Sequence, residues 1–372
     1  MAENPFNFGD LALDETFTDR AAELAELTAD IRNGQNVVVF APRRYGKSSL
    51  VWRAVQDLTA ADAALVAYVD LMRTPTKERL AARLAEAIHE EIATPLMRAR
   101  ERAMQAFRGL RISPSMTIGD DGRVRFSFTA GLAPSDVDAT LERLFELPAE
   151  LAGERGKRVA VVFDEFHEIL EIDRHLPALM RSVFQLQPEV CHVYLGSKRT
   201  LMQRLFSDSS EPFWRSARHM ELGPIPAEEF SRFIRERFES TGRAVASDVI
   251  ARILETTAGH PYATQELCYA LWDAGTLDAA LDRVLRSEDA RFTLIWDQAS
   301  GVQRLVLQAL AAEDTTSITA VDYRRRHGLP GSSSVQRALE ALMSVELVAR
   351  DAPGAYRIAE PFLAEWVRRF AA

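Results

Sequence analysis

The sequence predicts an α/β protein: a parallel sheet sandwiched by helices, followed by a helical segment and a C-terminal winged helix. Three observations support this fold class. An apolar strand pattern near residue 40 runs into a glycine-bearing loop and a helix. Further strand and helix patterns alternate up to about residue 222, and the C-terminal part combines helices with two short strands. Strands separated by helices imply βαβ units and a mostly parallel sheet.

The composition is that of an ordinary globular chain. The 372 residues, 47% hydrophobic and 27% charged, are enough for two or three domains. A net charge of −9 argues against indiscriminate nucleic-acid binding. Cys191 and Cys268 lie in apolar patterns and are expected to be buried free thiols. Because no apolar run approaches the ~18 residues that span a bilayer, and no secretory signal opens the sequence, we expect a cytoplasmic protein without membrane contact.

The stretch from residue 37 to residue 50 predicts a phosphate-binding loop between a buried strand and a helix. The loop is a GxxxxGK[ST] motif whose first glycine is replaced, and its residues are Ala41, Pro42, Arg43, Arg44, Tyr45, Gly46, Lys47, Ser48 and Ser49. Its amides and the helix N-terminus would hold phosphate oxygens. Lys47 would bind the β- and γ-phosphates, and Ser48 would bind Mg²⁺. Ala41 fits the first position only with a negative φ or little strain.

The remaining elements follow from periodicity. Apolar residues at helical spacing predict one helix before the loop, ending near residue 32, and another after the loop, at 47–58. Apolar runs predict strands at 64–71, 158–164 and 190–196, and helical patterns follow residue 76 and span 134–151. Alternating apolar residues on either side of Gly119-Asp120-Asp121-Gly122 predict an inserted β-hairpin at about 111–129.

A second chemical motif ends the strand at 158–164. The apolar run Val159–Phe163 leads directly into Asp164 and Glu165. The carboxyl end of a parallel strand would place Asp164 beside Mg²⁺ and Glu165 beside the attacking water. Two carboxylates are needed because one binds the metal while the other accepts a proton. His167 and Glu168 are interpreted as the start of the next helix rather than as ligands.

Strand patterns stop after Pro224 and Pro226, which separates three expected domains. The sheet domain with its inserted hairpin covers residues 1–222, a helical lid covers 223–292, and a winged helix covers 293–372. In the last segment, three helical patterns, two short strands around a Pro-Gly turn and a final helix predict this helix-turn-helix variant.

Six segments together give the chain a resemblance to the archaeal-type ATPase family. They are Phe17-x-x-Arg20-x-x-Glu23, APRRYGKSSL, VVFDEFHEIL, LGSKRTLM, PFWRSA and GHPY. That family lies among the STAND and AAA+ groups of P-loop proteins and is related to origin-recognition ATPases. The resemblance implies a P-loop NTPase fold, ATP and Mg²⁺ as cofactors, and ATP hydrolysis.

The resemblance also implies roles for residues outside the two motifs. Phe17 and Arg20 would lie near the adenine; the alternative is a helix staple and a surface cation. Ser197 would occupy the position that senses the γ-phosphate. Gly259-His260-Pro261-Tyr262 resembles the lid turn that contacts nucleotide, so His260 and Pro261 join the expected site. An arginine finger acting in trans within a homo-oligomer would come from Arg215, with Arg218 and Arg199 as alternatives, and surface charge or a helix cap would explain Ser197 and these arginines equally.

The motifs support one main hypothesis of function and leave two alternatives open. The main hypothesis is a Mg²⁺-dependent ATPase, slow in turnover, whose nucleotide state switches conformation or assembly. The first alternative is a nucleotide-regulated DNA-binding protein that uses the basic run Arg324 to Arg326 and Arg337. From residue 293 onward, however, nine arginines oppose nine carboxylates, which is weak for a DNA-binding module. The second alternative is a scaffold in a defence or toxin–antitoxin-like system.

Overall fold

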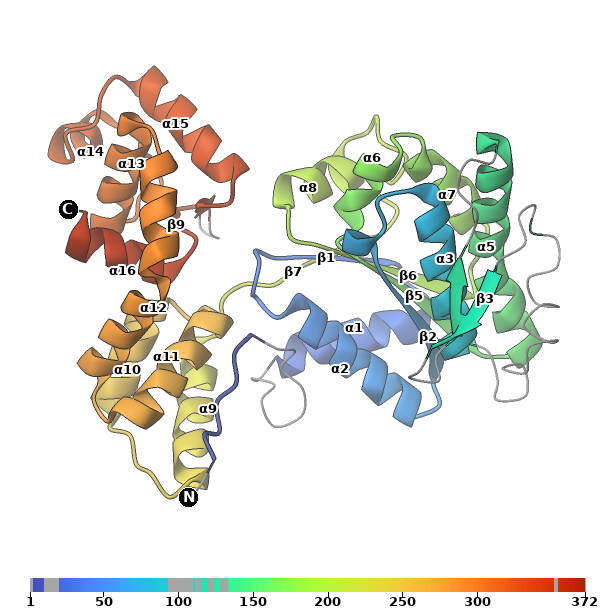
Figure 1. Ribbon diagram of the computed structural model, residues 1–372, viewed down its shortest axis with the longest axis horizontal. Coiled ribbons are helices and arrows are strands. Elements are labelled where there is room, and N and C mark those ends of the chain that lie inside the picture. Colours follow the sequence, from blue (N-terminus) through green and yellow to red (C-terminus); the bar gives the residue numbers. More distant parts are fainter. Residues whose placement is uncertain are drawn as a thin grey trace. The chain divides into compact units, whose positions relative to one another are not determined.

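The chain divides into two compact units in the computed structural model, which describes residues 3–9, 20–92, 110, 115–119, 124–127, 133–350 and 354–371 (Figure 1). One, here named the sheet unit, comprises Arg20–Arg43 and Lys47–Gly223. The other, named the helical unit, comprises Met1–Asp19, Arg44–Gly46 and Pro224–Ala372. The tip of the predicted phosphate loop therefore groups with the helical unit, while the loop's two ends group with the sheet unit.

The sheet unit is built on five parallel strands in the order β2-β5-β6-β1-β7. The strands are β1 Val37–Phe40, β2 Ala64–Asp70, β5 Arg158–Asp164, β6 Val190–Gly196 and β7 Arg218–Glu221. Every residue of β1 and β6 is buried, as expected for strands covered on both faces. Because β6 lies between β1 and β5, the carboxyl ends of these three strands lie next to one another at one edge of the sheet.

Helices cover both faces of this sheet. In Figure 1, α1 and α2 lie on one face and α3, α5 and α7 on the other. The helices of the sheet unit are α1 Ala21–Asn33, α2 Lys47–Ala60, α3 Lys77–Ala87, α5 Pro134–Arg155, α6 Ile169–Ile172, α7 Leu176–Phe184 and α8 Arg199–Ser207. Apolar residues of α3, α5 and α7 share one buried cluster with the strands, which fixes that layer. The predicted α/β fold with a sandwiched parallel sheet is confirmed.

The predicted hairpin is present beside α3. Its strands, β3 Ser115–Ile118 and β4 Val124–Ser127, pair antiparallel with Thr117 opposite Arg125. Phe126 is buried, and its ring packs against His89 in the turn that follows α3. The turn at 120–123 and the outer parts of the expected 111–129 range lie outside the described residues, as does Phe17.

The helical unit contains the expected lid helices and winged helix. Its helices are α9 Ala227–Ser240, α10 Ser247–Thr257, α11 Pro261–Ala274, α12 Leu277–Gln298, α13 Gly301–Ala312, α14 Val321–Arg326, α15 Ser332–Ser344 and α16 Pro361–Phe370. Strands β8 Val348–Arg350 and β9 Tyr356–Ile358 form the wing. One apolar cluster extends through the whole unit. Helix α12 continues past the division proposed between residues 292 and 293, so the two parts share a helix.

Several elements were not anticipated from the sequence, among them α7, α8, β7 and α12. Strand β7, of sequence RHME, has no β-branched residue and only one fully buried side chain, so its periodicity gives no strand signal. It forms because its backbone pairs with β1 along the edge of the sheet. The 22-residue helix α12 was also not predicted. Cys191 and Cys268 are both buried, as expected, and within the described ranges no helix is long and apolar enough to cross a membrane.

Candidate active site

The loop after β1 has the backbone conformation that its sequence requires. Gly46 has φ +82°, in the left-handed region where a side chain is strained. Arg44 has φ +64°, an uncommon value for a residue other than glycine. Ala41 is 2% exposed and has no positive φ. Alanine therefore replaces the first glycine of the motif without backbone strain, which meets the condition set from the sequence.

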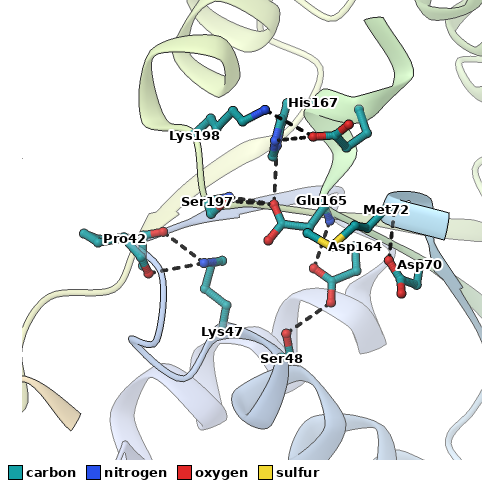
Figure 2. A network of polar contacts seen from close by, with 12 residues as sticks. Pro42, Lys47, Ser48, Asp70, Met72, Asp164, Glu165, His167, Ser197 and Lys198 are labelled. Atoms are coloured by element: carbon teal, nitrogen blue, oxygen red, sulfur yellow. Dashed lines mark hydrogen bonds and ion pairs between the residues drawn. The ribbon is translucent and has the colours of Figure 1, made fainter. Parts of the chain in front are cut away.

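Lys47, the first residue of α2, is held against its own loop. Its side chain is 6% exposed, and its ammonium group donates to the carbonyl oxygens of Ala41 at 3.0 Å and Pro42 at 3.3 Å. Figure 2 shows the ammonium within the curve of the loop. An ammonium group in this position can exchange carbonyl oxygens for phosphate oxygens, which carry a full negative charge and form stronger hydrogen bonds.

Ser48 at the start of α2 and Asp164 at the end of β5 are in contact. The Ser48 hydroxyl donates to Asp164 Oδ2 at 3.1 Å, although 116 positions separate them in the chain (Figure 2). Tyr68 at the end of β2 also donates to Asp164 Oδ2. Burial and the Asp164 carboxylate raise the pKa of Tyr68 far above its ordinary value, so its hydroxyl stays a donor. Trp52 stacks on the Tyr68 ring at 4.9 Å and holds it in place.

The pair of oxygens from Ser48 and Asp164 fits the demands of Mg²⁺. This ion takes oxygen ligands and is usually bound through one or two carboxylates together with substrate phosphates, rather than in an all-protein cage. No group of three or more His, Cys, Asp or Glu side chains that could hold a metal occurs in the described part of the chain. The tyrosine hydroxyl on the same Asp164 oxygen orients that carboxylate.

Glu165 is positioned by Ser197 at the end of β6. Glu165 Oε2 accepts a hydrogen bond from the Ser197 amide at 3.1 Å and another from the Ser197 hydroxyl at 2.9 Å. Ser197 is 2% exposed, and Glu165 has φ +50°, a left-handed conformation. Ser197 therefore holds the Glu165 carboxylate directly. The family resemblance had implied a different role for Ser197, sensing the γ-phosphate.

His167 is a member of this site that sequence reasoning assigned to a helix start. It lies in the 3₁₀ turn Phe166–Glu168, is 2% exposed, and places Nδ1 3.4 Å from Glu165 Oε2. Its Nε2 lies 3.1 Å from Glu168 Oε1, which Lys198 also contacts at 3.2 Å (Figure 2). Burial lowers the pKa of His167, so the imidazole is neutral near pH 7. The only signal in the sequence was its spacing of two residues from Glu165.

The loop tip contacts the lid turn and the wing within the helical unit. The Tyr45 ring packs edge-on against the His260 ring at 4.7 Å, and Arg357 of β9 donates to the Tyr45 hydroxyl at 3.2 Å. The Arg44 guanidinium lies 4.1 Å from the centre of the Tyr262 ring. Burial, with added repulsion from Arg357 and Arg44, lowers the pKa of His260 to about 3. His260 is therefore neutral, and its ring contacts Tyr45.

The lid turn has the structure that its Gly-His-Pro sequence favours. Gly259 has φ +69°, and a Cβ there would come within 2.7 Å of the Ile225 carbonyl oxygen. Pro261 is the first residue of α11, and His260 Nδ1 caps that helix by accepting from the Ala263 amide at 3.3 Å. The histidine thus has a structural role, and Pro261 supports the helix start.

Arg20 is a buried residue, so its interpretation as a surface cation is wrong. It is 4% exposed, donates to the Gly223 carbonyl oxygen at 2.8 Å, and pairs with Glu23 at 3.0 Å. These contacts tie the start of α1 to the chain that leaves β7. Phe17 lies outside the described residues.

The three arginines considered for the role of arginine finger differ in the partners that they contact within the sheet unit. Arg218 pairs with Asp30 and Glu26 of α1. Arg199 pairs with Glu221 at 2.9 Å. Arg215 is exposed, with its guanidinium 4.8 Å from the centre of the Trp214 ring, which is itself 42% exposed.

A parallel sheet with a phosphate loop after β1 and an acidic pair after β5 is the fold of P-loop ATPases. Residues 17–267 match the family described as ATPase domain predominantly from Archaea, and the chain belongs to that family. Residues 290–369 match a family described as probable winged helix domain. The resemblance inferred from the motifs is confirmed.

Solved structures show the same fold over nearly the whole chain. The Walker-type ATPase of Pyrococcus abyssi is 19% identical, with a TM-score of 0.70 over 98% of this chain and 99% of that one. The Aeropyrum pernix ORC2 protein in its ADPNP–ADP complexes is 16% identical, with a TM-score of 0.52 over 95% and 96%. The Aeropyrum pernix ORC1 protein in complex with DNA is 14% identical, with a TM-score of 0.50 over 95% and 92%. A search of curated proteins gave no match.

Proposed function

We propose that this chain binds and hydrolyses ATP with Mg²⁺ and that its nucleotide state switches conformation or assembly. The observation that carries the proposal is the meeting of Ser48, Asp164, Glu165 and Ser197 at one edge of the sheet, next to Lys47. The loop and strand ends supply a phosphate-binding lysine, two oxygen ligands for a metal and a second carboxylate. Phosphoryl transfer needs these groups mainly for positioning and for neutralising charge.

Each residue has a distinct part in the proposed reaction. Lys47 holds the β- and γ-phosphate oxygens, and the loop amides hold the remaining ones. Ser48 and Asp164 hold Mg²⁺, which when bound neutralises charge on the phosphates. Glu165 accepts a proton from the attacking water, while Ser197 keeps the Glu165 carboxylate oriented through two hydrogen bonds.

The decisive test replaces the carboxylate that would accept the proton. Glu165→Gln keeps the size of the side chain and one acceptor oxygen, so we expect the ATP affinity of the variant to be within about twofold of wild type. Loss of a general base lowers rates by roughly 10²–10⁴-fold, and we expect turnover to fall at least about 100-fold. Measuring ATP binding by calorimetry and phosphate release in the same preparation separates the two effects. Glu171→Gln, at an exposed position of α6, is the control, and wild-type turnover in Glu165→Gln would remove Glu165 from this role.

A trans arginine is the proposed link between hydrolysis and assembly, and Arg215 is the best candidate. Arg218 is occupied by carboxylates of α1, and Arg199 by Glu221, whereas Arg215 is exposed beside Trp214. If Arg215 completes a neighbouring subunit's site, mixing Arg215→Ala with Lys47→Ala should restore part of the activity that each variant lacks alone. A mixture as inactive as its components would contradict an arginine finger in trans.

DNA binding through the winged helix is the second candidate function. It rests on Arg325 and Arg337, both exposed and without an ion-pair partner in the described ranges. A basic surface of this kind binds phosphate backbones in a salt-dependent way. Duplex binding that weakens with salt and is lost in the double variant Arg325→Ala, Arg337→Ala would support it. Equal duplex binding by wild type and the double variant would exclude this surface.

A further inference from the structure

A hollow between α3 and the inserted hairpin gathers arginines in the sheet unit. It has a volume of about 290 Å³, and its lining includes Arg79 and Arg83 of α3 and Arg125 of β4. None of these residues belongs to the site at the sheet edge. This volume lies just below the roughly 300–1,000 Å³ of pockets for drug-sized ligands, so the hollow would suit only a smaller molecule.

Polar side chains line the hollow from both α3 and the hairpin. On α3, Arg79 and Arg83 are four residues apart and share one face of the helix. On the hairpin, Thr117 lies directly opposite Arg125, and Ser127 is two residues further along the same strand, so all three share one face. Three guanidinium groups and two hydroxyls therefore border a single hollow, and all five can donate hydrogen bonds.

Glu86 is the carboxylate among the described residues that line the hollow, and it has a structural task. Glu86 Oε1 accepts from the Phe126 amide at 3.0 Å, which ties β4 to α3. Its other oxygen, Oε2, lies 3.1 Å from the Arg83 guanidinium and orients it. On the opposite face of β4, the buried Phe126 ring packs 5.6 Å from the buried His89 ring, which anchors the hairpin beside α3. The walls are therefore held together without a ligand.

The balance of charge indicates the ligand. Among the described residues that line the hollow, three arginines stand against one glutamate, a formal sum of +2, whereas the whole chain carries −9. A phosphomonoester carries nearly two negative charges at neutral pH, and its three terminal oxygens match the planar donor fork of arginine. Arg79 is exposed and has no ion-pair partner within the part of the chain that the structure describes. It is thus available to an incoming anion.

We propose that this hollow, named here the α3–hairpin pocket, binds a small phosphomonoester, held by Arg79, Arg83 and Arg125 with Thr117 and Ser127. The same group could come from a soluble phosphorylated metabolite or from the 5′-phosphate end of an oligonucleotide. The pocket acts independently of the nucleotide at the phosphate loop.

The test is calorimetric titration of the full chain with ribose 5-phosphate as the probe and ribose as its uncharged counterpart. We expect ribose 5-phosphate to bind and ribose not to bind. Arg79→Ala and Arg125→Ala should each weaken binding about tenfold, because each removes charge-assisted hydrogen bonds. Both residues are exposed, so unchanged melting temperatures would confirm that the variants fold. Arg174→Ala, at an exposed arginine between α6 and α7, is the matched control and should bind as wild type does.

Two further experiments identify the source of the phosphate group and distinguish the α3–hairpin pocket from the phosphate loop. A trinucleotide with a 5′-phosphate is compared with the same trinucleotide ending in a 5′-hydroxyl, and a preference for the phosphorylated form supports the proposal. If the two forms bind equally and Arg79→Ala abolishes both, the pocket binds phosphodiesters, and the proposal of a phosphomonoester site is overturned. Displacement of ribose 5-phosphate by ADP, or equal affinity in Arg79→Ala, Arg125→Ala and wild type, would also overturn it.

Discussion

The acidic pair at the sheet edge and the arginine run of α14 are both short clusters of like charge, yet the structure uses them differently. Asp164 and Glu165 accept hydrogen bonds from Ser48 and Ser197, which orient the two carboxylates. In α14, Arg324 donates instead to two carbonyl oxygens of its own domain. The carboxylates of the first cluster are held by partners on other elements of the sheet unit, whereas Arg324 in the second cluster contributes to the fold of its own domain.

Three neighbours of Arg324, which do not include the exposed Arg325, show the same use. Arg326 forms two hydrogen bonds with Glu313, at 2.9 and 2.7 Å, and His327 lies 3.1 Å from the same carboxylate. Tyr323 is buried and donates to the Glu313 carbonyl oxygen at 2.7 Å. A run of like charges therefore predicts a binding surface only where its partners are not found within the same domain. Three predictions test this contrast.

The largest effect is expected from Lys47→Ala. Removing the ammonium group removes the strongest phosphate contact that the loop can make, so ATP affinity should fall at least about 100-fold. Equilibrium binding of a fluorescent ATP analogue measures this directly. Lys157→Ala, at a half-exposed lysine beside Asp62 before β5, should leave affinity unchanged. ATP affinity in Lys47→Ala equal to that of wild type would remove the lysine from the site.

A smaller effect is expected from Ser197→Ala. The hydroxyl supplies one of two hydrogen bonds to Glu165 Oε2, and the backbone amide keeps the other. We expect turnover to fall about tenfold, the equivalent of one charge-assisted hydrogen bond, while ATP affinity stays the same. Comparing kcat with the ATP dissociation constant separates positioning from binding. Ser182→Ala on α7 is the control, and a loss of affinity with unchanged kcat would show that Ser197 contacts nucleotide instead.

The smallest effect concerns stability. Arg324→Ala leaves the Thr319 and Pro330 carbonyl oxygens without these donors, which should lower the free energy of unfolding by ~1–3 kcal/mol. Arg325→Ala, next to it but exposed, should change stability by less than about 0.5 kcal/mol. Urea denaturation of the two variants makes the comparison. Equal stabilities would mean that Arg324, like Arg325, is available for another partner.

Local sequence signals were enough for the parts of this protein in which neighbouring residues act together. The β1–loop–α2 motif, the apolar run ending at Asp164 and the winged-helix pattern each depend on residues close in the chain, and the structure has all three. Strand β7 gave no such signal, because its pairing with β1 supplies the stabilisation that its own residues lack.

The sequence by itself determined which residues are proposed for phosphate chemistry: a glycine-bearing loop with Lys47 and Ser48, and an acidic pair that ends a buried strand. Only the tertiary structure decided how those residues are held. Ser197 on Glu165, Tyr68 on Asp164 and Arg357 on Tyr45 join positions 32, 96 and 312 residues apart. No local period encodes such contacts, since they depend on strand order and on how helices pack, and these are properties of the whole chain.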